Sequence, residues 1–585
     1  MNTLFRIAFG DYEFVLDRTN LTYSLTETVT KTVWATALSL GWIELKDRAT
    51  GAVTRTDFGE CKLISIAEKM GAAGKRILLG LDAPGGVPID IYLICGSKDI
   101  QLTVEASRDS KTHLLERVGL LPGLASVCTE GEYLFWPTGD DQWPEHLFWE
   151  EAEPSHEIAG SIWYTLRMPF LGAVRRESAL ALLTDSAYAT ARVSYPKSGM
   201  AFNWEYQRDP ERRRLDIRIV VLPKGDGVAI CKAYRDKLVG ERHHRTLRMR
   251  MRERPQLESL LGAVAISPIT PIPKQEIPEG TLLALPARWQ RVHEFPKPIV
   301  MLPQWLGLTA EQEVELIHAW QSAGWRMWGT VSIGSDEPLS YTPHYQEPRV
   351  AAWREAGMEL VSAASYNGLM GHPDGSWEEM EQRLREVREL QTQFSLITGG
   401  LNDWMATTTD FCWQFDSCLS HAVVWRDAIV TFSSVAYTSR AANPFLFPRQ
   451  LLFLDAPLIT LGTVLEPIGE GFLAAALAIL CPLHQLTFAA FLKSHRFLTP
   501  DRQVQETLYT DGTRVVANFR EDNYETDEFL LPPGGFYVRH PQFEAHDALR
   551  VGTVAFSQRA WRVRRSLDGK PLEQSVQVEE REFEV

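Results

Sequence analysis

The sequence lacks the short motifs that mark several large enzyme classes. It contains no Walker loop, no Gly-x-Ser-x-Gly elbow and no His-Glu-x-x-His pair, so phosphate transfer, serine hydrolysis and zinc proteolysis are each unsupported. Seven cysteines are scattered along the chain without a Cys-x-x-Cys pair. This odd number and wide spacing favour reduced structural thiols over a disulfide framework or a zinc site. We expect no metal and no cofactor.

Long apolar runs are also missing. No stretch approaches the roughly 18 apolar residues that a membrane span requires, and the first residues lack a basic segment followed by an apolar one. We therefore expect a cytoplasmic protein without a membrane partner. Acidic residues outnumber basic ones, 75 to 60, so the formal net charge is −15. An acidic surface repels phosphates, so we expect no nucleic-acid partner. The sequence indicates no oligomeric state.

The composition that is present is typical of a large globular protein. The 585 residues are 45% apolar and 23% charged, which predicts two to four folded domains. The 18 tryptophans have two interpretations. Sugars present flat C–H faces that stack on aromatic rings, so the enrichment favours carbohydrate as the partner, whereas large β-rich cores account for it equally well.

The hydrophobic period changes twice along the chain, which indicates domain boundaries. Residues 1–225 consist of short alternating runs with turn signals between them, and they predict a β-sandwich. Residues 226–255 are helical in pattern; the basic stretch from Arg242 to Arg254 predicts a solvated linker helix rather than a nucleic-acid site, because no aromatic residues are interleaved with it. Residues 256–500 alternate between strands and helices, which predicts a (β/α)₈-like barrel.

Individual elements of this alternation carry clear local signals. Thr309-Ala-Glu-Gln312 is a capping box that predicts a helix ending at Gly324, and Ser376-Trp-Glu-Glu379 predicts a second helix. Residues 299–302, 325–333, 358–363 and 396–398 are predicted strands. Further along, Asp511-Gly512 between alternating segments predicts a hairpin.

Several segments carry a resemblance to a known family: residues 495–519, Leu531-Pro-Pro-Gly-Gly-Phe536, Met168-Pro-Phe-Leu-Gly-Ala-Val174, residues 229–238 and Leu260-Leu-Gly-Ala263. Together they resemble one group of glycoside hydrolases, that of the endo-α-N-acetylgalactosaminidases and the related exo-acting α-N-acetylgalactosaminidases. The resemblance implies a multidomain α/β and all-β protein with an N-terminal β-supersandwich (1–225), a linker helix (226–255), a catalytic (β/α)₈-like barrel (256–500) and a C-terminal β-sandwich (501–585). It also implies hydrolysis of an α-linked hexose or N-acetylhexosamine by a pair of carboxylates.

The positions that the group uses for catalysis are substituted in this chain. Gly368-Leu-Met370 and His372-Pro373 match the group's pattern, but Ser362 or Ala363 stands where the group has its nucleophilic Asp. Asp403-Trp404 matches an Asp-Trp pair, but Gly400 or Leu401 replaces the preceding Glu. Serine and glycine cannot supply a carboxylate's charge or proton. The alternative function is therefore a catalytically silent relative that binds carbohydrate or acts as a scaffold.

Other residues remain as candidates for the site. Asp403 and Asp410 are the predicted catalytic pair, relocated from the group's positions; the alternative is that they bind sugar hydroxyls or cap local backbone. The predicted substrate-binding residues are Trp404, His372, Asp427, Arg426, Asp416 and Trp136. Because βα loops of a barrel share one rim, we expect Asp403, Trp404, Asp410, Asp427 and His372 to converge there. Trp136 belongs to an aromatic cluster that either stacks on sugar rings or is buried in a structural contact.

Overall fold

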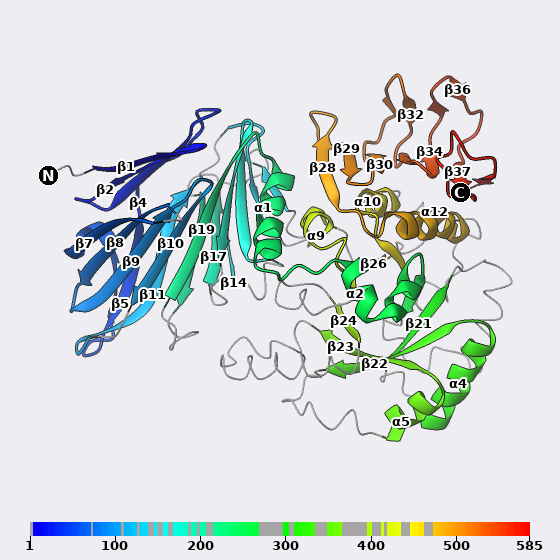
Figure 1. Ribbon diagram of the computed structural model, residues 1–585, viewed down its shortest axis with the longest axis horizontal. Helices are drawn as coiled ribbons and strands as arrows, with labels where there is room; N and C mark the ends of the chain where they lie inside the picture. The colour runs from blue at the N-terminus through cyan, green and yellow to red at the C-terminus, as the bar shows by residue number, and fades with distance from the viewer. Residues whose placement is uncertain are drawn as a thin grey trace. The chain divides into compact units, whose positions relative to one another are not determined.

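The chain divides into two compact units, Met1–Glu241 and Arg242–Val585. The computed structural model describes residues 4–71, 74–106, 110–125, 129–137, 145–148, 156–161, 168–184, 189–195, 199–205, 214–267, 283, 297–303, 309–333, 348–365, 395–399, 411–414, 418–434, 445–460 and 472–584. Figure 1 traces the elements of each unit.

The first unit is built of antiparallel strands. Its strands are β1 Leu4–Phe9, β2 Tyr12–Asp17, β3 Thr22–Glu27, β4 Val33–Ser39, β5 Gly41–Asp47, β6 Val53–Asp57, β7 Lys62–Gly71, β8 Gly74–Ala83, β9 Val87–Cys95, β10 Asp99–Ala106, β11 His113–Leu124, β12 Tyr133–Phe135, β13 His146–Phe148, β14 His156–Ser161, β15 Phe170–Arg175, β16 Ser178–Thr184, β17 Ala189–Tyr195, β18 Gly199–Glu205 and β19 Arg214–Pro223. Within the described residues they form three sheets, in the orders β1-β2-β3-β4, β14-β17-β18-β11-β5-β6 and β13-β12-β15-β16-β19-β10-β9-β8-β7.

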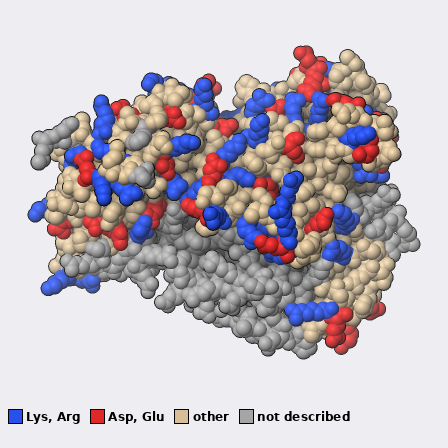
Figure 2. All heavy atoms as spheres, viewed as in Figure 1, with Lys and Arg blue, Asp and Glu red and all other residues tan. Residues whose placement is uncertain are grey.

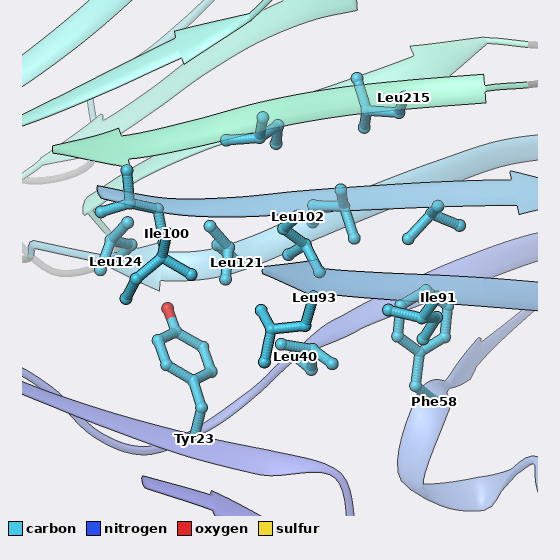
Figure 3. Close-up of a cluster of buried hydrophobic side chains, with 14 of the residues drawn as sticks. Tyr23, Leu40, Phe58, Ile91, Leu93, Ile100, Leu102, Leu121, Leu124 and Leu215 are labelled. Carbon is cyan, nitrogen blue, oxygen red and sulfur yellow. The ribbon is translucent and has the colours of Figure 1, made fainter. Parts of the chain in front are cut away.

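One apolar core joins these three sheets. Side chains alternate between buried and partly exposed along β2, β3 and β10, as the period of a half-buried strand requires. Figure 3 shows Tyr23 of β3, Leu102 of β10 and Leu121 of β11 in the same cluster, and all three are almost fully buried. The sheets therefore depend on one another for their burial.

Helix α1, Gly227–Gly240, packs on the nine-stranded sheet, beside β15, β16 and β19. Asp226 caps it, because the Asp226 carboxylate accepts a hydrogen bond of 2.9 Å from Ala229 N. Gly172 of β15 lies where a Cβ would come within 2.5 Å of the Ile230 side chain. The glycine in the Met168–Val174 segment thus lets the helix approach the sheet closely.

The second unit begins with a barrel. Its elements are α2 Leu247–Glu253, a 3₁₀ turn Pro255–Leu260, β20 Val264–Ser267, β21 Pro298–Pro303, α4 Ala310–Ser322, β22 Arg326–Ile333, α5 Pro348–Glu355, β23 Glu359–Ser365, β24 Ser395–Gly399, β25 Phe411–Gln414, α9 Leu419–Val424, β26 Val430–Ser434, α10 Leu446–Phe453, β27 Ala456–Thr460 and α12 Phe472–Thr487. Strands β20 to β27 pair in sequence order, every pair is parallel, and β27 pairs with β20 to close the barrel.

Two packed sheets complete the second unit. Their strands are β28 Leu492–Phe497, β29 Val504–Tyr509, β30 Arg514–Asn518, β31 Tyr524–Glu525, β32 Phe529–Leu531, β33 Phe536–His540, β34 Phe543–Asp547, β35 Arg550–Val551, β36 Val554–Ala555, β37 Trp561–Ser566 and β38 Val578–Phe583. Among the described residues, seven strands form the order β28-β29-β30-β33-β34-β37-β38 and four form β31-β32-β35-β36. Val516 of the larger sheet and Phe529 of the smaller share one core. The strand-rich, several-sheet architecture expected from the sequence is confirmed.

Aromatic side chains fix the larger C-terminal sheet to two helices of the barrel. The Trp561 ring of β37 stacks on Phe447 of α10 at 4.3 Å between centroids, and it lies 5.3 Å from Phe472 of α12. The carbonyl of Leu452 in α10 also accepts hydrogen bonds from Thr507 Oγ1 at 3.0 Å and from the Tyr509 hydroxyl at 2.6 Å. The sheet and the barrel helices thus bury one another.

The local signals of the sequence are present where the structure describes them. Thr309 Oγ1 accepts from Gln312 N at 3.3 Å and Gln312 Oε1 accepts from Thr309 N at 3.0 Å, so the predicted capping box is confirmed. Gly512 has φ +89° in the turn between β29 and β30, so the predicted hairpin is also confirmed. The predicted helix at Ser376 lies outside the described residues.

The structure also bears on the basic stretch from Arg242 to Arg254 and on the cysteines. The basic stretch before the barrel is less solvated than predicted, because Arg250 of α2 is buried and its Nε donates to Arg245 O at 3.1 Å. The cysteines that the structure describes with side chains are buried and unbridged, as expected; they are Cys61, Cys95, Cys231, Cys418 and Cys481. Within the described residues, no group of three or more His, Cys, Asp or Glu side chains is placed to hold a metal ion. None of the described helices is both long and apolar enough to cross a bilayer.

Asn518, the last residue of β30, has a side chain that hydrogen-bonds to the backbone around the loop that follows. Its side chain is fully buried, and its amide nitrogen lies 2.9 to 3.1 Å from the carbonyl oxygens of Asp522, Leu531 and Pro532. The Asn518 side-chain oxygen accepts from Arg520 N at 3.0 Å. The side chain therefore satisfies backbone groups on both sides of the loop between the two C-terminal sheets.

We expect Asn518→Asp to lower the free energy of unfolding by about 3 kcal/mol, because a carboxylate cannot donate to those buried carbonyls and places a buried negative charge against their oxygens. Urea unfolding followed by fluorescence measures the change. Asn523→Asp, at an exposed position of the same loop, is the control and should alter stability by less than about 0.5 kcal/mol. Equal stability of the two variants would contradict this role.

Candidate functional site

The closed parallel barrel determines where the candidate site is expected. All eight strands run in one direction, so the segments that leave their carboxyl ends share one rim, where barrel enzymes carry their reactive groups. Every one of those eight segments begins outside the described residues. Asp403, Trp404, Asp410, Asp416 and His372 all lie outside the described residues too, so their predicted convergence stays a prediction.

Of the positions where the resemblance expects catalytic residues, only those on β23 lie among the described residues. Ser362 and Ala363 lie within β23, where they pair with Leu396 and Ile397 of β24. Gly400 directly follows Gly399, the last residue of β24, and lies outside the described residues. The expected nucleophile position is therefore on a strand of the barrel.

Asp427, a predicted substrate-binding residue, lies before β26 rather than after it. Its carboxylate Oδ1 is 3.4 Å from His244 Nε2, and its backbone carbonyl accepts from Leu247 N at 2.6 Å. Both side chains are buried, and the His244 ring stacks on Trp425. These contacts fasten the entry segment of the barrel to the amino end of β26, which favours a structural role for Asp427.

Arg426, also a predicted substrate-binding residue, is buried at the same end of the barrel. Arg426 Nη2 donates to Thr487 Oγ1 at 2.8 Å, at the end of α12. Burial lowers the pKa of Arg426, because the charged guanidinium has lost its water. A group enclosed in this way holds elements together rather than meeting a substrate, so the structural interpretation is favoured here as well.

A buried histidine that the sequence did not single out belongs to this polar layer. His484 of α12 accepts a hydrogen bond from Gly262 N at 3.1 Å through Nδ1. Burial, with Arg426 and Lys297 adding to it, lowers the pKa of His484 well below its usual range. The ring is therefore neutral at pH 7, and its remaining proton is on Nε2. Gly262 and Lys297 each lie just ahead of a strand, which again places the layer at the barrel's amino end.

Trp136, the predicted sugar-stacking residue, is fully buried in the core of the first unit. Its backbone N donates to Glu145 O at 2.8 Å, just beyond β12. Nearby, the Tyr133 hydroxyl accepts from Gly227 N at 3.0 Å and so ties β12 to the start of α1. An indole without exposed surface has no face to offer a sugar, so the structural alternative is favoured for Trp136.

Charge on the described surface is mixed in sign. On the face that Figure 2 shows, blue and red side chains are interspersed over the described residues. In the C-terminal sheet this mixing is regular, because arginines of β37 pair with glutamates of β38; Arg562 with Glu582 is one case.

Comparison with known proteins shows the fold. No protein-family model matches the chain, and no curated protein resembles it in sequence. The ligand-free structure of the α-N-acetylgalactosaminidase NagBb from Bifidobacterium bifidum aligns with a TM-score of 0.68 at 14% identity, over 89% of this chain and 100% of that chain. The GalNAc complex of that protein aligns with a TM-score of 0.66 at 13% identity, over 88% and 98%. The chain therefore shares the fold of that structure.

The contacts of Asp427 lead to a test of its role. We expect Asp427→Asn to lower the free energy of unfolding by about 1–3 kcal/mol, because a buried carboxylate with a charged or hydrogen-bonding neighbour is replaced by a neutral amide. Saccharide binding and any hydrolysis should stay within about twofold of wild type. Chemical unfolding and calorimetric titration measure the two effects. Exposed Asp527→Asn is the matched control, and unchanged stability with lost binding would contradict the structural role.

Proposed function

We propose that this protein is a glycoside hydrolase that acts on an α-linked hexose or N-acetylhexosamine. The observation that supports it most is the shared fold, which extends over 89% of the chain and belongs to a protein named as an α-N-acetylgalactosaminidase. The closed barrel supplies the kind of rim on which glycosidic chemistry is built. The sequence segments around Gly368, His372 and Asp403 resemble the same group of enzymes.

The register of the barrel guides the choice of the catalytic pair. Gly399 of β24 pairs with Trp413 of β25, so the two strands end side by side. Asp403 follows Gly399 by four positions and Asp416 follows Trp413 by three, whereas Asp410 directly precedes Phe411, where β25 begins. Chain order therefore supports Asp403 with Asp416 ahead of Asp403 with Asp410. In the proposal, Trp404 and His372, which also follow carboxyl ends, contact the sugar.

Two carboxylates suffice for the reaction. One protonates the departing glycosidic oxygen, and the other either attacks the anomeric carbon or activates a water on the opposite face of the ring. A separation of about 5–5.5 Å between the carboxyl groups gives retention, and about 6.5–9.5 Å gives inversion. No metal ion is needed for either course.

A catalytically silent relative is the second candidate. Ser362 or Ala363, and Gly400 or Leu401, stand where the group has its nucleophile and its acid/base, and none of these side chains has a carboxylate. In that case the barrel rim binds carbohydrate without cleaving it. Weak hydrolysis is expected even if the relocated pair works, because its geometry differs from that of the group.

A screen of aryl α-glycosides of galactose, glucose, N-acetylgalactosamine and N-acetylglucosamine tests the proposal. We expect slow turnover of at least one substrate by wild type. Asp403→Asn and Asp416→Asn should each lower kcat by about 10²–10⁴-fold, because each removes a proton donor or a stabilising charge while keeping the shape. Asp410→Asn, the matched control in the same segment, should retain activity.

The other outcomes are informative in different ways. Loss of activity in Asp410→Asn with activity kept in Asp416→Asn would restore the pair Asp403 and Asp410. Robust turnover that survives all three substitutions would overturn both pairs. Absence of turnover on every sugar, together with measurable oligosaccharide binding, would favour the silent relative.

A further inference from the structure

A cavity of about 510 Å³ opens on the larger C-terminal sheet. Four adjacent strands supply charged side chains to its lining: Arg514 of β30, Arg539 of β33, Glu544 of β34 and Arg564 of β37. The register makes each of these residues the direct cross-strand neighbour of the next. Adjacent strands lie about 4.8 Å apart, so the row extends roughly 14 Å across the sheet. A regular sheet therefore forms one side of the cavity.

Every guanidinium group of this row already has a carboxylate partner. The ion pairs are Arg514 with Glu506 at 2.7 Å and with Glu528 at 2.6 Å, Arg539 with Glu573 at 3.0 Å, and Arg564 with Glu580 at 2.9 Å. The positive charge of the row is thus balanced from within the protein. Each guanidinium has five N–H donors, so the ion pairs leave some of them for a ligand that does not need the charge.

Glu544 differs from its neighbours in the row. Its side chain is partly buried, and among the described residues its carboxylate makes neither a hydrogen bond nor an ion pair. Burial raises the pKa of Glu544, although Arg564 and Arg539 act in the opposite direction. A partly buried acceptor without a donor costs free energy. A ligand that donates a hydrogen bond to Glu544 recovers this cost.

His540 contributes a neutral group to the lining of the same cavity. Its Nδ1 accepts a hydrogen bond of 3.1 Å from Gln542 N. Burial lowers the pKa of His540, so the ring is neutral at pH 7 and its proton is on Nε2. The lining therefore includes a neutral donor as well as the acceptor of Glu544.

Another wall of the cavity is ordered before any ligand binds. It belongs to the loop between β37 and β38, where Leu572 N donates to Pro541 O at 2.7 Å. Within this loop Asp568 accepts hydrogen bonds from the hydroxyls of Ser575 at 2.7 Å and Ser566 at 2.8 Å. A wall that is fixed in advance loses little conformational entropy when a ligand binds.

The charges of the cavity disfavour an ionic ligand of either sign. An anion would meet Glu544 and Glu573 on the lining and would have to compete for guanidinium groups that are already paired. A cation at Glu544 would approach Arg539 and Arg564, its direct neighbours on both sides. A neutral hydroxyl group meets neither obstacle, because it donates to a carboxylate and accepts from a spare guanidinium N–H without breaking an ion pair.

We propose that this cavity is an accessory binding site for a neutral saccharide. A sugar ring carries adjacent hydroxyl groups, so one of them donates to Glu544 while its neighbour accepts from Arg539 or Arg564. Leu508 and Leu572 also line the cavity and give apolar contact to the C–H faces of the ring. The site lies on the C-terminal sheet, apart from the barrel strands, and it does not rest on the proposed hydrolysis.

Calorimetric titration of the full chain with maltotriose, cellotriose and triacetylchitotriose, which are neutral trisaccharides, tests the site. We expect at least one of them to bind. Its affinity should change by less than about twofold between about 0.05 and 0.5 M salt, because binding neutralises no charge. Trigalacturonate, which is acidic, and the glucosamine trimer of chitosan, which is cationic, should each bind at least about tenfold more weakly than the best neutral trisaccharide.

Glu544→Leu should weaken binding of that trisaccharide by about tenfold or more, because it removes the acceptor and keeps most of the side-chain volume. The carboxylate has no protein partner among the described residues, so the midpoint of urea unfolding should stay unchanged or rise. Glu582→Leu is the matched control. Glu582 belongs to the same sheet and pairs with Arg562, but it does not line the cavity, so its loss should alter the affinity by less than about twofold.

Four outcomes would each overturn the site. They are no binding of any neutral trisaccharide, tighter binding of either charged trimer, wild-type affinity in Glu544→Leu, and a lower unfolding midpoint in Glu544→Leu, which would make Glu544 a structural residue. Aryl glycoside turnover, measured in parallel, reports on the proposed function separately, and Glu544→Leu should leave any such turnover unchanged.

Discussion

The common direction of the eight barrel strands is the constraint on which the rest of the second unit depends. Closure of a parallel sheet leaves no free edge and gives the barrel two chemically different ends. Groups that precede a strand meet at one end, and groups that follow a strand meet at the other. Arg426 and Asp427 share a short chain segment with the predicted site residues, but they precede β26 and so belong with the stabilising contacts.

The polar groups buried at the amino end of the barrel reduce the free-energy cost of their burial in two ways. Removing a charge from water is expensive unless hydrogen bonds replace the lost hydration. His484 avoids this cost because its ring is neutral. The charged Arg426 regains part of its lost hydration through the hydrogen bond to Thr487. Such a layer adds directional requirements to the packing of α12 against the barrel, which apolar contacts alone do not impose.

Local signals in the sequence predicted local structure well. The capping box at Thr309 and the Asp511-Gly512 turn depend on residues a few positions apart, and both formed as expected. The role of Asp427 depends instead on His244, which is far away in the chain, and the role of Trp136 depends on its enclosure in a whole core. A short sequence pattern indicates neither. For the same reason no sequence pattern indicated a role for His484, whose partner Gly262 lies more than two hundred residues earlier.

The stacking of Trp561 on Phe447 and its contact with Phe472 also bear on how the chain is made. A ribosome delivers α10 and α12 well before β37, so these helices leave the exit tunnel with their aromatic sides uncovered. Exposed apolar surface of this kind makes nascent chains prone to aggregate and to engage chaperones. The barrel thus reaches its final packing only when the last strands arrive, and the C-terminal sheet serves as the cover that ends this vulnerable interval.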